Sequence, residues 1–137
     1  MALSNVQVID DHWIGAQGLS LYQLMACTDL LITDFSSVMI DYILMDQPVI
    51  CFSTDFENYK KTQGVYFEDF ENWLPTKLIQ DQEGFFSLLT ELLSTGADPY
   101  EEKRKKILDL YFTHQDADST QRIVTHVFNN FNTIKAS

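Results

Sequence analysis

The stretch of sequence that decides the fold reads Asp29-Leu30-Leu31-Ile32-Thr33-Asp34-Phe35-Ser36-Ser37-Val38. Its apolar run is uninterrupted, which is typical of a strand that is covered on both faces of a parallel sheet. The run stops at Asp34, and the apolar residues from Val38 to Met45 then recur at helical spacing. The stretch therefore predicts a buried strand, a short turn and a helix, in that order.

The same alternation extends in both directions from this stretch. Gln47-Pro48 ends the helix, and Val49-Ile50-Cys51-Phe52 follows as a second buried strand. Upstream, the β-branched segment Val6-Gln7-Val8-Ile9 predicts an earlier strand. Short connections and intervening helices make this a βαβαβ core over residues 1–75 with right-handed crossovers. The fold class is thus α/β, with a Rossmann-like parallel sheet flanked by helices.

The second part of the chain, residues 76–137, is predicted to be mostly helical and to belong to the same single domain. Three predicted parallel strands are fewer than the about five of an average sheet. The domain therefore looks like the later part of a doubly wound fold whose first strands are missing. The other predicted elements are a loop over 10–18, a helix capped by Ser20 and running through Met25, a short helix capped by Asp55 and covering 59–63, an extended segment at 65–67, an irregular one at 68–75, an edge strand at 77–79, and helices over 82–93, 99–112 and 118–131.

Composition narrows the possible functions. Nine basic residues against 20 acidic ones give a net charge of −11, which repels phosphate backbones and makes nucleic acid an improbable partner. No apolar run approaches the about 18 residues of a membrane span, and the first residues lack a signal-peptide pattern. Cys27 and Cys51 are isolated in apolar stretches, so we expect two reduced core thiols in a cytoplasmic protein.

The best candidate site is the turn of Asp34, Ser36 and Ser37. Ligands of open α/β sheets bind at the carboxyl ends of the strands, and backbone amides at a helix start attract anions. The amides of Ser36, Ser37 and Val38, with the two hydroxyls, would suit a phosphate or diphosphate. The alternative is that Ser36 only caps the helix and Asp34 only ends the strand.

Other polar residues give weaker signals. His12, in the predicted loop, could act as a base or a ligand, but a solvated histidine is the simpler interpretation. Asp116, Ser119 and Arg122 lie around the start of the last helix, where Arg122 could reach an anion. The basic run Lys103–Lys106 follows two glutamates at helical offsets, which indicates a solvated face with ion pairs. His114 and His126 have no partner at a metal-site spacing, so no metal is predicted.

Several motifs in order resemble one protein family. The stretch 29–42 is similar to the strand-turn-helix of the CDP-glycerol glycerophosphotransferases, the teichoic-acid polymerases and primases of bacteria. Gln47-Pro48-Val49-Ile50 resembles the family's "kPvi", Asp55–Tyr59 its "DleeY", Gly64–Glu68 its "GfyfD" and Asp116–Val124 its "DgkaseRiv". The resemblance covers roughly residues 20–128. The ordered set is far more specific than any single motif.

The resemblance implies a GT-B fold, of which this chain would be the later part of the C-terminal, nucleotide-binding domain. Such enzymes transfer glycerol phosphate from CDP-glycerol to a polyol-phosphate polymer and release CMP, without a required metal or cofactor. They work at the inner face of the bacterial membrane, with which the intact protein would associate only peripherally. Asp34, Ser36 and Ser37 would then line the CDP-glycerol pocket, with Ser119 and Arg122 near it.

Some family features are absent, which keeps other functions open. The family's two histidine segments have no counterpart, "pGp" is replaced by Trp73–Thr76, and Ala117 stands for a glycine. The chain by itself is therefore not expected to be a competent transferase. One alternative is a non-catalytic module that binds a nucleotide or a protein, with self-association through the sheet edge left by missing strands. A flavodoxin-like receiver is disfavoured: Asp10-Asp11 mimics its acidic pair, but no lysine follows residues 49–52 where one is needed.

Overall fold

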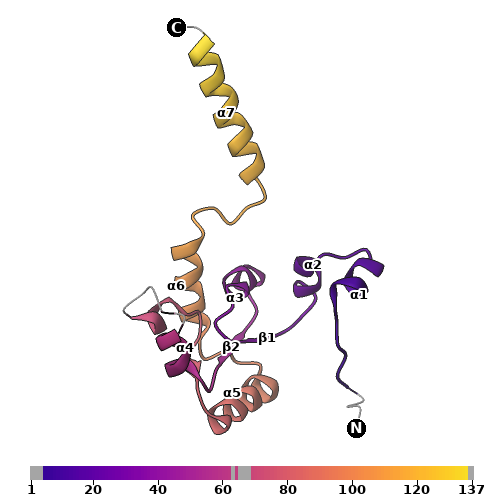
Figure 1. Ribbon diagram of the computed structural model, residues 1–137, viewed down its shortest axis with the longest axis vertical. Coiled ribbons are helices and arrows are strands. Elements are labelled where there is room, and N and C mark those ends of the chain that lie inside the picture. Colours follow the sequence, from indigo (N-terminus) through magenta and orange to yellow (C-terminus); the bar gives the residue numbers. More distant parts are fainter. Residues whose placement is uncertain (1–4, 63, 65–68, 136–137) are drawn as a thin grey trace.

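The computed structural model describes residues 5–62, 64 and 69–135. Its centre is a three-stranded parallel sheet in the order β1-β2-β3, with helices on both faces (Figure 1). Leu31 of β1 is in register with Val49 of β2, and Cys51 of β2 with Leu78 of β3. The elements are α1 (Asp11–Ala16), α2 (Leu21–Met25), β1 (Leu31–Thr33), α3 (Val38–Tyr42), η1 (Ile43–Met45), β2 (Val49–Phe52), α4 (Phe56–Thr62), η2 (Phe70–Trp73), β3 (Leu78–Ile79), α5 (Gln82–Thr95), α6 (Glu101–Tyr111) and α7 (Ser119–Lys135).

The central strand β2 separates two apolar clusters, because successive side chains of a strand point to opposite faces. Cys51 faces the larger cluster, which α3, η1, α4 and α6 cover with Tyr42, Ile43 and other side chains. Ile50 faces the smaller cluster, which α5 covers through Leu88. The predicted α/β class with helices on both sides of a parallel sheet is therefore confirmed.

The predicted first strand is wrong. Residues 6–9 form no strand and pair with no described segment, and Val8 is 88% exposed. The reason is that β-branched composition favours a strand only where a neighbouring strand accepts its hydrogen bonds. The third strand of the sheet is instead β3, the segment predicted as an edge strand. It lies in parallel beside β2.

The predicted loop over 10–18 is also partly wrong, because it contains α1. The Asp10 side chain accepts a hydrogen bond from the Trp13 amide at 2.8 Å and so caps this helix. The capping box of α2 agrees with the prediction: Ser20 Oγ accepts from the Gln23 amide at 3.2 Å, and Gln23 Oε1 accepts from the Ser20 amide at 2.8 Å.

The later helices agree with the predicted ones to within a few residues at each end. The expected extended segment at 65–67 lies outside the described residues. α7 extends from the end of α6 away from the sheet (Figure 1). The apolar side chains described between residues 119 and 129 lie in solvent, and Ile123 and Phe128 are each 64% exposed. No described helix is long and apolar enough to cross a membrane.

Candidate functional site

The predicted turn lies at the carboxyl end of β1, and its own side chains close it. Asp34 Oδ1 accepts a hydrogen bond from the Ser36 amide at 3.1 Å, and Ser36 Oγ accepts one from the Val38 amide at 3.4 Å. The expected outward-pointing amides of Ser36 and Val38 are thus already bonded locally. The capping alternative for Ser36 is therefore partly realised.

Ser37 has a different position in the turn. It is the residue before the first turn of α3, with φ −61° and ψ −15°, and its side chain makes no capping hydrogen bond. Its carbonyl accepts from the Ile40 amide at 2.9 Å, which starts the helix. Asp34, Ser36 and Ser37 are all exposed, so the turn presents one carboxylate and two hydroxyls to solvent at this end of the sheet.

A buried thiol contacts the backbone of the turn. Cys51 Sγ donates a hydrogen bond to the Asp34 carbonyl at 3.3 Å. Burial, assisted by the negative charge of Asp34 and opposed by Lys103, raises the pKa of Cys51 to about 12. The side chain therefore stays protonated near neutral pH, where it is a hydrogen-bond donor and not a nucleophile.

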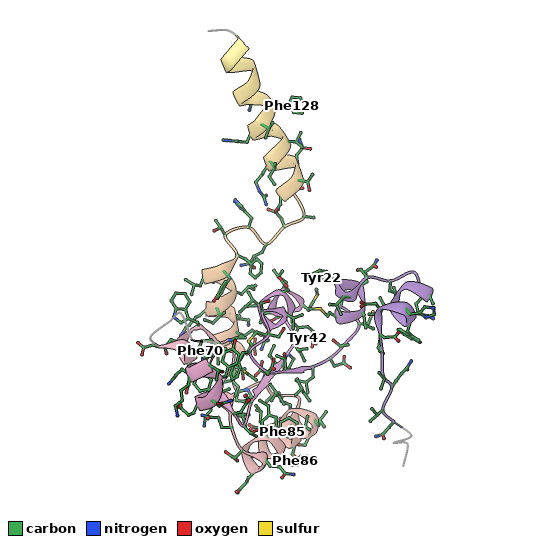
Figure 2. The ribbon with its side chains drawn as sticks, viewed as in Figure 1. Tyr22, Tyr42, Phe70, Phe85, Phe86 and Phe128 are labelled. Carbon is green, nitrogen blue, oxygen red and sulfur yellow. The ribbon has the colours of Figure 1, made fainter. Side chains whose placement is uncertain are left out.

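An aromatic cluster packs around the phenylalanine of the turn. It consists of Phe35 within the turn, Phe56 and Tyr59 on α4, and Phe70 on η2. The Phe35 ring centroid lies 5.1 Å from Phe56, 4.6 Å from Tyr59 and 5.8 Å from Phe70. Figure 2 places Phe70 among the crowded side chains of the body. The cluster joins the turn to two elements that come later in the chain.

The second predicted group forms a cluster of its own. Arg122 Nη1 donates to Asp116 at 2.8 and 3.1 Å, and its Nη2 donates to Ser119 Oγ at 2.9 Å. The backbone amide of Asp118 and the Arg122 guanidinium hold the pKa of Asp116 below its usual range. This group lies at the start of α7, which points away from the sheet (Figure 1). Ser119 and Arg122 are therefore not brought to the Asp34 turn.

The structure corrects two more expectations, one for His12 and one for Cys27. His12 is exposed, but on helix α1 and not in a loop. Cys27, expected in the core, is exposed, and its thiol donates to the Gln23 carbonyl. No cluster of three potential metal-ligating side chains occurs within residues 5–62, 64 and 69–135.

The basic run on α6 contains buried groups that sequence reasoning missed. Arg104 is only 5% exposed; it pairs with Asp98 and, at 3.1 Å, with Asp46. Lys103 Nζ donates to the Glu71 and Thr76 carbonyls, each at 2.8 Å, and burial lowers its pKa. Lys105 pairs with Glu101, as expected of a solvated face. The one available signal was that Arg104 shares a helix face with Ile107.

A depression of about 550 Å³ lies at the other end of the sheet, where Leu30 precedes β1 and Pro48 precedes β2. Asp29, Asp46 and Glu101 line it together with Arg104. These carboxylates disfavour a phosphate there. The carboxyl end of β1 carries one exposed carboxylate, Asp34, beside the hydroxyls of Ser36 and Ser37.

Comparison with known proteins identifies the family. Residues 5–129 match the family described as CDP-glycerol:poly(glycerophosphate) glycerophosphotransferase. A teichoic acid ribitol-phosphate polymerase of Staphylococcus aureus is 36% identical over 106 residues, which are 77% of this chain and 19% of the relative. A teichoic acid ribitol-phosphate primase of Bacillus spizizenii is 35% identical over 111 residues, 79% of this chain and 26% of the relative.

A teichoic acid glycerol-phosphate transferase of Staphylococcus aureus is 27% identical over 124 residues, 88% of this chain and 32% of the relative. The chain thus spans about a fifth to a third of the length of these relatives. The family match includes both predicted groups, the Asp34 turn and the Asp116–Arg122 cluster. The chain belongs to the CDP-glycerol:poly(glycerophosphate) glycerophosphotransferase family.

Proposed function

We propose that this chain forms the donor-phosphate side of the active site of a glycerophosphotransferase that uses CDP-glycerol in teichoic acid synthesis. The observation that carries the proposal is that the family match runs through the Asp34–Ser37 turn, which lies where parallel sheets bind ligands. The chain would be the later part of the C-terminal domain of a GT-B enzyme. A polyol-phosphate polymer would bind on the rest of that enzyme.

The chemistry of the turn assigns different roles to its residues. A carboxylate repels a diphosphate, so Asp34 acts by holding the Ser36 amide and not by direct contact. The hydroxyls of Ser36 and Ser37 donate to the phosphate oxygens. Ser36 Oγ accepts from the Val38 amide at 3.4 Å, which leaves its hydroxyl proton to donate to a phosphate oxygen. Donors fixed at this point stabilise the charge that develops on the departing CMP.

Arg122 and Ser119 have a further part in this proposal. Arg122 is the cation that would balance the donor phosphates, since the turn itself carries only Asp34 as a charged group. In the structure it pairs with Asp116 at 2.8 Å. The complete enzyme would bring the start of α7 towards the turn and exchange this carboxylate for a phosphate. The complete enzyme would act in the cytoplasm, peripherally at the inner membrane face. A base in another part of that enzyme would deprotonate the acceptor hydroxyl.

The second candidate is a non-catalytic binding module that self-associates. The observation in its favour is the outer edge of β1, which pairs with no other described strand. Ile32 on this strand is 48% exposed. Such an edge pairs readily with another chain.

Calorimetric titration with CDP-glycerol, CMP and UMP tests the donor site. We expect binding that prefers the cytidine nucleotides and weakens at least tenfold in Ser36→Ala/Ser37→Ala, because two charge-assisted hydrogen bonds are lost. The matched control is Ser94→Ala on α5, which removes an exposed hydroxyl bonded only within its own helix. A folded chain that binds none of the three ligands would refute the donor site and leave the binding module.

A further inference from the structure

The turn contains an apolar residue between its polar ones. Phe35 follows Asp34 and precedes Ser36, and it is half-buried while both neighbours are exposed. Its side chain packs against the larger apolar cluster of the core. The chain bends at Asp34 and Phe35, and while Phe35 faces inward the side chains on either side of it lie exposed to solvent.

Phe35 is also the point at which three separated parts of the chain meet. Phe56 and Tyr59 come from α4 and Phe70 from η2, and all three ring centroids lie within 5.8 Å of the Phe35 centroid. Phe56 and Phe70 also stack on each other at 5.5 Å. The ring of Phe35 therefore contacts two other elements that are also in contact with each other. Movement of the turn would have to break several ring contacts together.

The turn also makes hydrogen bonds. Those of the Ser36 amide to Asp34 Oδ1 at 3.1 Å, of the Val38 amide to Ser36 Oγ at 3.4 Å and of the Ile40 amide to the Ser37 carbonyl at 2.9 Å stay within the turn and the start of α3, and the Cys51 thiol bonds the Asp34 carbonyl from β2. A thiol is a poor donor, and the local bonds do not join the turn to any element other than α3. The aromatic cluster is therefore the contact that joins the turn to other elements through several side chains.

We propose that Phe35 is a positioning residue for the donor phosphate: its ring, locked between α4 and η2, fixes the directions of the Ser36 and Ser37 hydroxyls. This inference rests on the proposed function. Phe35 does not touch the ligand itself. Its contribution is to keep the two hydroxyls preorganised, so that no ordering of the turn opposes binding.

The test compares two half-buried phenylalanines that both contact other rings. Phe35→Leu removes the ring beside the turn. Phe85→Leu is the matched control, because Phe85 lies on α5 at the other face of the sheet and contacts Phe52 at 4.9 Å. CMP affinity is measured by calorimetry for both variants. Hydrogen exchange of the Ser36, Ser37 and Val38 amides is measured without ligand.

We expect Phe35→Leu to bind CMP about tenfold more weakly and to exchange the three amides faster. Phe85→Leu should change neither quantity, and Phe35→Tyr, which keeps the ring, should restore both. The inference is overturned if Phe35→Leu binds CMP as tightly as the unmodified chain, or if Phe85→Leu weakens binding equally. If the unmodified chain binds no CMP, the proposed function fails, and the amide exchange alone decides whether Phe35 orders the turn.

Discussion

The ionisation of Cys51 makes the free energy of unfolding of the chain depend on pH. Its pKa is raised from 9.0 to about 12 in the folded chain, chiefly by burial. Above pH 9 the thiol of the unfolded chain releases its proton, whereas the thiol of the folded chain keeps it. The contribution of Cys51 to the free energy of unfolding is therefore fully present below pH 9 and declines as the pH rises towards 12. The expected slope is at most about 1.4 kcal/mol per pH unit.

Urea unfolding of the chain and of Cys51→Ala between pH 8 and 11 measures the contribution of Cys51, because all other groups titrate in both proteins. The free energy of unfolding of the unmodified chain should fall more steeply above pH 9. Lys103, whose pKa burial lowers, contributes with the opposite sign to both proteins. Parallel pH profiles would show that Cys51 ionises equally in the folded and unfolded states.

Arg104 is a second single residue that contributes to the free energy of unfolding. It joins α6 to Asp98, whose side chain is 11% exposed, and to Asp46, whose side chain is 71% exposed. Arg104→Met would leave the Asp98 carboxylate buried without its cation, so we expect a loss of about 3 kcal/mol of unfolding free energy in a urea titration. Arg104→Met/Asp98→Asn should regain part of it, since the buried charge is then gone. Equal losses in both variants would contradict this explanation.

At the scale of elements, the helices contribute unequally to stability. α5 buries Leu88 against the sheet, whereas α7 keeps an apolar stripe in solvent, and Figure 2 shows Phe128 far from the body. Leu88→Ala should therefore cost about 2 to 5 kcal/mol. Phe128→Ser should change the unfolding free energy by less than about 0.5 kcal/mol. Differential scanning calorimetry of both variants measures the contrast, and a large loss in Phe128→Ser would mean that α7 packs on the body in solution.

How much of these elements sequence could predict depends on where their partners lie. β1 and β2 were predictable because each is an apolar run between turn residues. The expected burial on both faces holds for β2 but is wrong for β1, whose Ile32 is 48% exposed. The strand at 6–9 was predicted wrongly because strand formation needs a neighbour, which composition does not reveal. α1 was missed because a helix of six residues is set by the Asp10 cap and not by apolar periodicity.

The site follows the same division. A strand that ends in Asp34-Phe35-Ser36-Ser37 indicates a ligand-binding turn from local sequence alone. The contacts that hold it, from Cys51 and Phe70, come from distant positions and could not be predicted. Burial of Arg104 was hidden within a basic run, and its partners Asp98 and Asp46 lie 6 and 58 positions away.

At the scale of the whole molecule, we expect the edge of β1 that pairs with no other described strand to affect how the chain behaves in solution. Ile32 is 48% exposed on this strand, and the backbone groups on its outer side have no described partner strand. We expect the chain to associate with itself through this edge, because unpaired backbone groups next to apolar side chains favour strand addition. Sedimentation velocity over a dilution series should show a concentration-dependent increase in mass. Ile32→Lys should abolish the increase, since an edge lysine opposes pairing, whereas Leu93→Lys, at a 75% exposed site on α5, should not. A chain that sediments as a monomer throughout, or that loses association equally in both variants, would mean that the β1 edge does not pair.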